Sequence, residues 1–267
     1  RSADAARDLD AAATYFSAAL SNDPENPVLL ERVMVLRIAN GDIEPAIGYA
    51  ERLIDIDPRN PLARLLRGVV AVRNGAFAEA QEEVAQAARA PLAILTSGLL
   101  SAWAEQGNGN VDGALEIVDG LRGPTWYSIF KNYHTALIAD LDGREDVARD
   151  AVAAAFETDG TALRIAEANA RILARSGDRD GALEALDRFL EAQPNNPVIL
   201  DLRARLAADT DVEPLVGSSV EGVAEVLYGL GAAIGSDDGA ELAAAYLRLA
   251  LYLTPDSHLP LVALGDL

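Results

Sequence analysis

The sequence predicts an all-α fold, a solenoid of helix–turn–helix units, and two periodic patterns carry this prediction. Alanine recurs every 34 residues through most of the chain, and glycine keeps the same period, five positions ahead of an alanine. A period of about 20–50 residues held over several copies is typical of solenoids, in which each unit is one supersecondary element. The periodic positions are Ala12, Ala46, Ala80, Ala114, Ala148 and Ala182, with Gly41, Gly75, Gly109, Gly143 and Gly177.

Each unit is expected to hold two helices joined by a turn at the periodic glycine, which can adopt the left-handed conformation that ends a helix. The periodic alanine falls on the second helix, where a larger side chain would push the two helices apart. A proline then ends the second helix, and an Asn-Pro pair begins the next first helix, with Asn as the N-cap and Pro in the first turn. These residues are Pro24, Pro58 and Pro194, with Asn26-Pro27, Asn60-Pro61 and Asn196-Pro197.

The phase of these patterns predicts the domain organisation. A solenoid segment is expected over 1–208, with a partial first repeat, complete repeats at 27–60, 61–94, 95–128, 129–162 and 163–196, and a first helix at 197–208. Residues 209–220 contain Pro214 and Gly217 where a second helix should lie, so they are predicted to form an irregular joint. This joint is either a divergent unit that lost its helix or a functional loop in the groove of the solenoid.

The period resumes at 221–267, which is predicted to hold one repeat and the start of another. Gly231 and Gly265 are again 34 residues apart, and Ala243 takes the place of the periodic alanine. We expect residues 1–7 to supply only the tail of a first helix and residues 257–267 only the start of one. Terminal repeats need polar capping helices, but the last segment is apolar. The sequence therefore reads as a fragment of a longer repeat protein.

Composition narrows the class of partner. The chain has 42 acidic and 22 basic residues and a net charge of −20, and such a surface repels phosphate backbones and anionic lipid. We therefore expect no nucleic-acid partner, and no apolar stretch is long enough for membrane insertion. The absence of cysteine excludes disulfides and thiolate ligands. The alanine-rich composition with a single lysine, Lys131, suggests a bacterial source, whereas the compartment stays open.

No motif predicts catalysis, a cofactor or a metal site. The run from Asn108 to Asp119 imitates a calcium-binding loop, but its first position is Asn rather than Asp and its twelfth is Asp rather than Glu. Gly, Asn and Asp are favoured in turns for conformational reasons, and the run falls at a turn between helices. The two histidines, His134 and His258, belong to no catalytic arrangement. The chain is therefore predicted to have no catalytic residues, no cofactor and no metal.

The spacing of small, aromatic and proline residues resembles the tetratricopeptide repeat (TPR) family. Ala12, Phe16, Ala19 and Pro24 match the second helix of that repeat, and the last complete helix matches at Tyr246, Leu247, Ala250, Leu251 and Pro255. Most units lack the Trp and Tyr residues that the family carries in its first helix. The resemblance implies a right-handed α-α superhelix whose concave face is lined by the first helices, chiefly at their second, fifth, ninth and twelfth positions.

These inner positions supply the candidate binding residues. A protein or peptide partner is expected to contact Leu65, Val69, Leu99, Trp103, Phe130, Tyr133 and Leu137, of which Trp103 and Tyr133 should be partly exposed. The alternative is that the first helices are rotated and these residues are core, since Arg64 and Arg67 stand where the family buries apolar side chains. The predicted function is a non-catalytic protein–protein interaction scaffold. Two alternatives remain, a regulatory or targeting arm of a larger enzyme and a structural module that self-associates.

Overall fold

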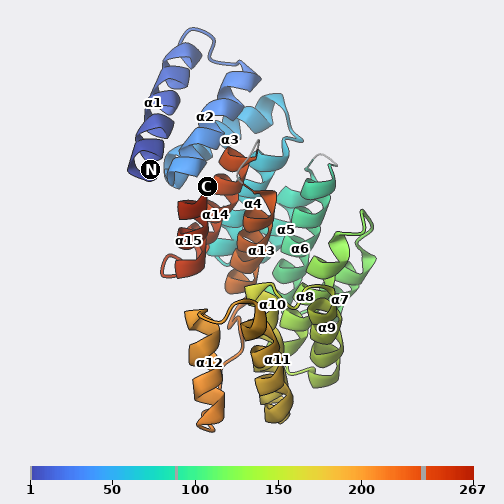
Figure 1. Cartoon of the computed structure of the whole chain (residues 1–267). Coiled ribbons are helices and arrows are strands. Elements are labelled where there is room, and N and C mark those ends of the chain that lie inside the picture. Colours follow the sequence, from blue (N-terminus) through green and yellow to red (C-terminus); the bar gives the residue numbers. More distant parts are fainter. Residues whose placement is uncertain (1, 88–89, 236–238) are drawn as a thin grey trace. The chain divides into compact units, whose positions relative to one another are not determined.

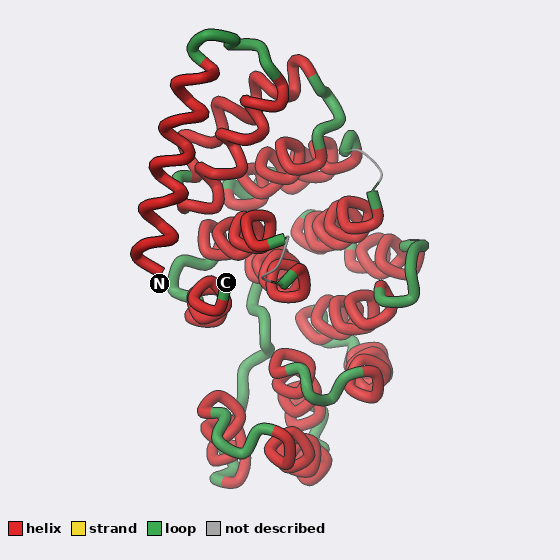
Figure 2. The backbone as a smooth tube through the Cα atoms, turned by 45° about the horizontal axis from the view of Figure 1, so that its top comes forward, coloured by secondary structure: helices red, strands yellow, loops and turns green. Residues whose placement is uncertain are grey.

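The computed structural model describes residues 2–87, 90–235 and 239–267, with side chains from Leu9 onward. Its described residues form fifteen α-helices and no strand. Figure 2 shows these helices joined by short loops. The predicted all-α fold of helical hairpins is therefore confirmed.

The first helices of the repeats mostly begin at or close to a proline. They are α2 (Pro27–Asn40), α4 (Pro61–Arg73), α6 (Pro91–Gly107), α8 (Tyr127–Leu141), α10 (Leu163–Arg175), α12 (Pro197–Ala207), α13 (Ser219–Ile234) and α15 (His258–Asp266). Asparagine side chains start three of them. The Oδ1 atom of Asn26 accepts hydrogen bonds from the amides of Val28 and Leu29, at 3.0 and 3.2 Å. Asn60 and Asn196 cap α4 and α12 in the same way. A cap of this kind contributes about 1 kcal/mol to stability.

The second helices carry the periodic alanines. They are α1 (Ser2–Leu20), α3 (Ile43–Ile56), α5 (Phe77–Ala85), α7 (Val111–Gly120), α9 (Glu145–Thr158), α11 (Arg179–Ala192) and α14 (Ala240–Leu253). Helix α1 is continuous from Ser2, so the expectation that residues 1–7 are the tail of a separate first helix is wrong over the described residues.

The periodic glycines end the first helices in the predicted conformation. All five have φ between 72° and 93°, a range that residues with a side chain rarely adopt. The sixth first helix, α12, ends in the same type of turn two residues early, and Asp209 takes the left-handed position with a φ of 58°. No second helix follows this turn, and residues 209–218 of the joint are irregular.

Small residues bring the two helices of a repeat together. The periodic alanines from Ala46 to Ala182 are at most 1% exposed, and only Ala12 is half-buried. Gly68 of α4 supplies the facing surface, because a Cβ atom there would lie 2.8 Å from the Cγ1 atom of Val84 in α5. Gly231 plays the same part in α13, where a Cβ atom would lie 3.0 Å from the Cγ atom of Leu247.

The chain forms two compact units. Unit 1 comprises the described residues up to Asn108 together with Val223–Leu267, and unit 2 comprises Gly109–Gly222. Unit 1 therefore contains α1–α6, most of α13, α14 and α15, so its core is built from two segments that are distant in sequence. Unit 2 contains α7–α12 and the joint.

Candidate functional site

Six of the seven predicted binding residues are buried. Phe130 alone is half-buried, and the exposure expected for Trp103 and Tyr133 is wrong, because their side chains are 0% and 6% exposed. The other four are at most 4% exposed: Leu65, Val69, Leu99 and Leu137. Trp103 belongs to unit 1 and Tyr133 to unit 2. The cause of their burial must therefore be sought within each unit.

In unit 1, the chain's own helix α14 lies against the first helices. Figure 1 shows α14 beside α2 and α4, which it contacts although more than 160 residues separate these elements. At an inner position of α6, the hydroxyl of Thr96 lies 3.0 Å from the hydroxyl of Tyr246 in α14. Burial raises the pKa of Tyr246, and the hydrogen bond with Thr96 opposes that rise only in part. Helix α14 thus reaches the face that the sequence assigned to a partner.

Charged and aromatic side chains fix α14 along this face. The guanidinium of Arg32 in α2 forms two hydrogen bonds with the carboxylate of Glu241, one of them 2.9 Å long. The Nε atom of Arg248 donates to the carbonyl of Ala39 at the end of α2, where a cation is favoured by the helix dipole. The guanidinium carbon of Arg73 in α4 lies 3.9 Å from the centre of the Tyr252 ring, which is a cation–π contact.

Tyr252 also touches the start of the neighbouring second helix. Its hydroxyl donates to Glu44 in α3 at 3.1 Å. We call the residues that receive α14 the docking face of unit 1. This face consists of Arg32, Ala39, Glu44, Arg73 and Thr96.

In unit 2, the joint lies against the first helices α10 and α12. Val212 and Val216 of the joint are 7% and 3% exposed, so they are anchored by apolar burial. Arg171 of α10 donates to the carbonyl of Glu213 at 3.0 Å, and Arg205 of α12 donates to the carbonyl of Asp211 at 3.3 Å. The joint therefore covers inner positions of unit 2.

A buried carboxylate organises the inner side of α10. Glu167 is 4% exposed and accepts hydrogen bonds from Arg164 at 2.7 Å and from Arg171 at 2.9 Å. A buried charge is tolerated when it is paired and hydrogen-bonded in this way. The same Arg171 holds the joint, so the ion cluster and the joint support each other.

A cavity of about 300 Å³ lies within unit 2, between the ends of α8 and α10 and the start of the joint. Asp140 and Arg175 line it and form an ion pair of 2.5 Å. Burial raises the pKa of Asp140, and the charge of Arg175 opposes that rise. Arg179, which also lines the cavity, is paired with Asp209 at 3.1 Å. The cations of the cavity are thus neutralised by the protein's own carboxylates.

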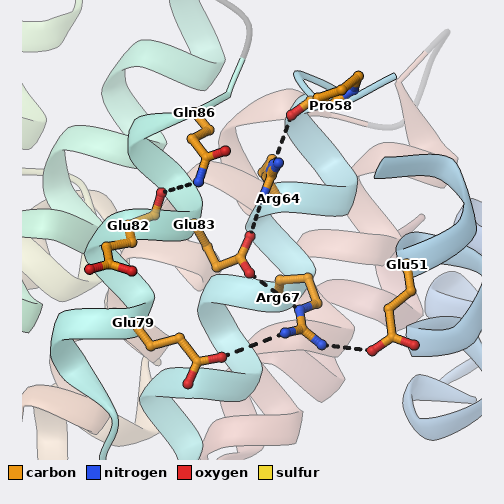
Figure 3. A network of polar contacts seen from close by, with 8 residues as sticks. All are labelled: Glu51, Pro58, Arg64, Arg67, Glu79, Glu82, Glu83 and Gln86. Atoms are coloured by element: carbon orange, nitrogen blue, oxygen red, sulfur yellow. Dashed lines mark hydrogen bonds and ion pairs between the residues drawn. The ribbon is translucent and has the colours of Figure 1, made fainter. Parts of the chain in front are cut away.

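A charged network in unit 1 explains the two arginines of α4 that break the family pattern. Arg64 is 7% exposed, and its Nη1 atom lies 2.6 Å from Glu83 in α5. Figure 3 shows Arg64 and Arg67 reaching Glu83, while Arg67 also contacts Glu51 and Glu79. The network therefore ties α4 to the second helices before and after it. These arginines are structural residues in a position that is usually apolar.

The calcium-like pattern proves to be helix capping. Asn110 accepts a hydrogen bond of 3.1 Å from the amide of Gly113 at the start of α7, and Asp178 caps α11 through Gly181 in the same way. Among the described residues, no group of three or more His, Asp or Glu side chains is placed to hold a metal ion. Within the same residues, no helix is long and apolar enough to cross a membrane.

The docking face is the part of the site that the sequence analysis missed. Its residues and their partners on α14 lie about 150–210 positions apart, and no local pattern links them. One signal was present, because α14 is apolar on nearly all sides, with Ala243, Ala245, Leu249 and Leu253 all buried. A helix that is apolar all round is buried on more than one face. Its second contact surface could therefore have been suspected.

Comparison with known proteins agrees with this architecture. A model of the tetratricopeptide repeat family matches residues 36–93. The structure is similar to that of YrrB, a TPR protein with an unusual peptide-binding site, with 18% identity and a TM-score of 0.50 over 72% of this chain and 100% of YrrB. It is also similar to a chain of the Cut9–Hcn1 hetero-tetramer of the APC/C, with 13% identity and a TM-score of 0.55. That match covers 96% of this chain and 45% of the other. A search of curated proteins gave no significant match.

These findings place the fold of the chain among the helical-hairpin repeat folds. The match to the tetratricopeptide repeat model is confined to residues 36–93, and the similar solved structures share the fold of such repeats.

Proposed function

We propose that the chain is a non-catalytic protein–protein interaction scaffold that binds a peptide or helical partner on the face of its first helices. The observation that carries this proposal is the docking of α14. An ion pair, a cation–π contact and a buried hydroxyl pair hold a helix on that face in unit 1. Docking of an amphipathic helix in a groove is a common mode of peptide recognition. The similar fold of YrrB, with its peptide-binding site, is compatible with this function.

In unit 2, an exposed tryptophan supports a partner-binding role for the start of α8. Trp126 is 42% exposed, and its ring packs edge-on against that of Phe130, with ring centres 6.1 Å apart. Tryptophan and tyrosine dominate the binding energy of many interfaces. We propose that Phe130 contacts a partner directly, and that the six buried candidate residues are reached only when the covering segments are displaced.

Photo-crosslinking tests the proposed binding face. A photoreactive phenylalanine analogue would replace Val28 or Phe130, which lie in the first turns of first helices α2 and α8 and are second in the repeats predicted at 27–60 and 129–162. The control position is Val147 on the second helix α9, which is 41% exposed, whereas Val28 is 72% exposed. We expect a partner protein to be crosslinked from positions 28 and 130 but not from 147. Crosslinking from 147 alone would contradict the proposal.

Self-association is a second candidate, and the surface of α15 favours it. Leu261 and Val262 are 49% and 62% exposed, and nothing lies within 4 Å of a Cβ atom built on Gly265. The equivalent glycine, Gly231, packs closely against a second helix. Light scattering at increasing protein concentration distinguishes this candidate, because Leu261→Glu with Val262→Glu should abolish any growth in mass.

A further inference from the structure

We propose that α14 is an internal competitor for the docking face of unit 1, and that the partner bound there presents a helix with the chemistry of α14. This inference rests on the proposed function and specifies its ligand and its regulation. Helix α14 acts as a bound ligand that belongs to the same chain, so its contacting side chains define what the face recognises.

Apart from Tyr246, which meets Thr96 from another side of the helix, the side chains of α14 that contact the face belong to one stripe. Glu241, Ala245, Arg248 and Tyr252 follow the spacing i, i+4, i+7 and i+11, which places them on one side of a helix. Ala245 is fully buried in the middle of the stripe, and the charged and aromatic residues contact Arg32, Ala39, Glu44 and Arg73. A matching partner helix therefore carries a carboxylate, a small residue, an arginine and a tyrosine at these intervals.

The C-terminal segment also has packing of its own. Gly231 of α13 packs against Leu247 and Tyr246 of α14, and α14 also packs against α15. The proposed displacement separates α14 from the docking face and keeps its packing against α13 and α15. The principal ion pair at the edge of the contact is accessible to solvent, since the side chains of Arg32 and Glu241 are 38% and 40% exposed. Exposed pairs of this kind hold a contact weakly.

Competition within one chain has a measurable consequence. The tethered α14 is present at a high effective concentration, so a partner helix binds only to the fraction of molecules whose face is free. Weakening α14 without changing the docking face should therefore strengthen binding of a helix supplied from outside.

A labelled synthetic peptide of residues 239–256 provides the probe, and fluorescence anisotropy with the full chain provides the measurement. The variant Glu241→Ala with Tyr252→Ala loosens α14 and leaves every residue of the docking face intact. We expect it to bind the peptide about fivefold to thirtyfold more tightly than the unchanged chain. This factor is the one by which the loss of two exposed contacts weakens the docking of α14. The control is Asp187→Ala, which removes a carboxylate that is 53% exposed and paired with Arg203 in unit 2, and it should leave the affinity unchanged. Equal affinities for the loosened variant and the unchanged chain would overturn the proposal.

A charge exchange keeps the test valid if the loosened variant folds poorly. The chain with Arg32→Glu should prefer a peptide carrying Glu241→Arg over the native peptide, and the unchanged chain should show the opposite preference. The same order of preference in both chains would also overturn the proposal. Crosslinking from positions 28 and 130 without any binding of the α14 peptide would refute α14 as a competitor and leave the proposed function standing. Peptide binding without such crosslinking would refute the proposed function alone.

Discussion

Replacing Glu83 with alanine tests the buried charge network of unit 1. The Glu83 carboxylate neutralises Arg64, whose side chain is 9% exposed, and the side chain of Glu83 itself is 14% exposed. After the substitution, Arg64 keeps only its hydrogen bond of 2.8 Å to the carbonyl of Pro58. Removal of one partner from a buried ion pair costs about 3–5 kcal/mol, because the remaining charge is left uncompensated.

Glu79 provides the matched control on the same helix. It lies 3.5 Å from Arg67, its side chain is 54% exposed, and its loss changes the net charge by the same amount. An exposed pair of this kind contributes only about 0–1 kcal/mol. Glu83→Ala should therefore destabilise unit 1 by several times as much as Glu79→Ala.

Urea denaturation followed by tryptophan fluorescence measures the difference. In a Trp126→Phe background, the remaining Trp103 lies in unit 1 and reports on that unit alone. With an m-value of about 2 kcal/mol per M, the midpoint should fall by roughly 1.5–2.5 M for Glu83→Ala. The double variant Arg64→Leu with Glu83→Leu should recover much of this loss, because no charge is then buried. Equal, small shifts for the two alanine variants would refute the assignment of a buried ion pair.

Three further predictions follow from packing, titration and exposure. Gly68→Ala should destabilise unit 1, because the new Cβ atom would lie 2.8 Å from Val84. Gly48→Ala should instead stabilise α3 by about 0.5–1 kcal/mol, because nothing lies within 4 Å of a Cβ atom there. Thermal melting of the two variants measures both effects. Because burial raises the folded pKa of Asp140 above its unfolded value, its ionisation costs stability as pH rises through this interval. The stability of the native chain relative to Asp140→Asn should therefore increase as pH falls toward 4, and a flat difference would refute this reasoning. In acrylamide quenching, the fully buried Trp103 of the Trp126→Phe variant should be protected, whereas the Trp126 of the Trp103→Phe variant should be quenched readily.

The periodic part of the fold could be predicted from the sequence because it depends on local geometry. A left-handed turn requires glycine, a close helix crossing requires a small residue, and a helix start favours Asn-Pro, so each constraint leaves a visible residue at a fixed spacing. The turn at Asp209 escaped this reasoning, because an aspartate takes the left-handed position there and the phase had moved by two residues. The irregular run after it was still visible from Pro214 and Gly217.

The exposure of the inner positions could not be predicted in the same way. The spacing that places Trp103 on a first helix is correct, but its exposure depends on what else lies against that helix. In unit 1, α14 contacts α2 and α4, and its Tyr246 reaches Thr96 of α6, about 150 positions away. Such a pairing depends on tertiary packing and leaves no periodic signal. Arg64 and Arg67 had suggested the alternative that the inner residues belong to the core. The position of these arginines is explained instead by their ion pairs with Glu83.

The central claim is that the first helices of unit 1 hold the chain's own helix α14, and a crosslink between α6 and α14 tests it most directly. The chain contains no cysteine, so Thr96→Cys with Tyr246→Cys gives a single reactive pair. Their native hydroxyls are 3.0 Å apart, and a short bismaleimide can replace the span of the tyrosine side chain. We predict an intramolecular crosslink in high yield, seen as a faster-migrating species on denaturing gels. This species should not form when the protein is unfolded in urea before the bismaleimide is added. The absence of this crosslink from the folded protein, with both thiols reactive toward a monofunctional maleimide, would contradict the account.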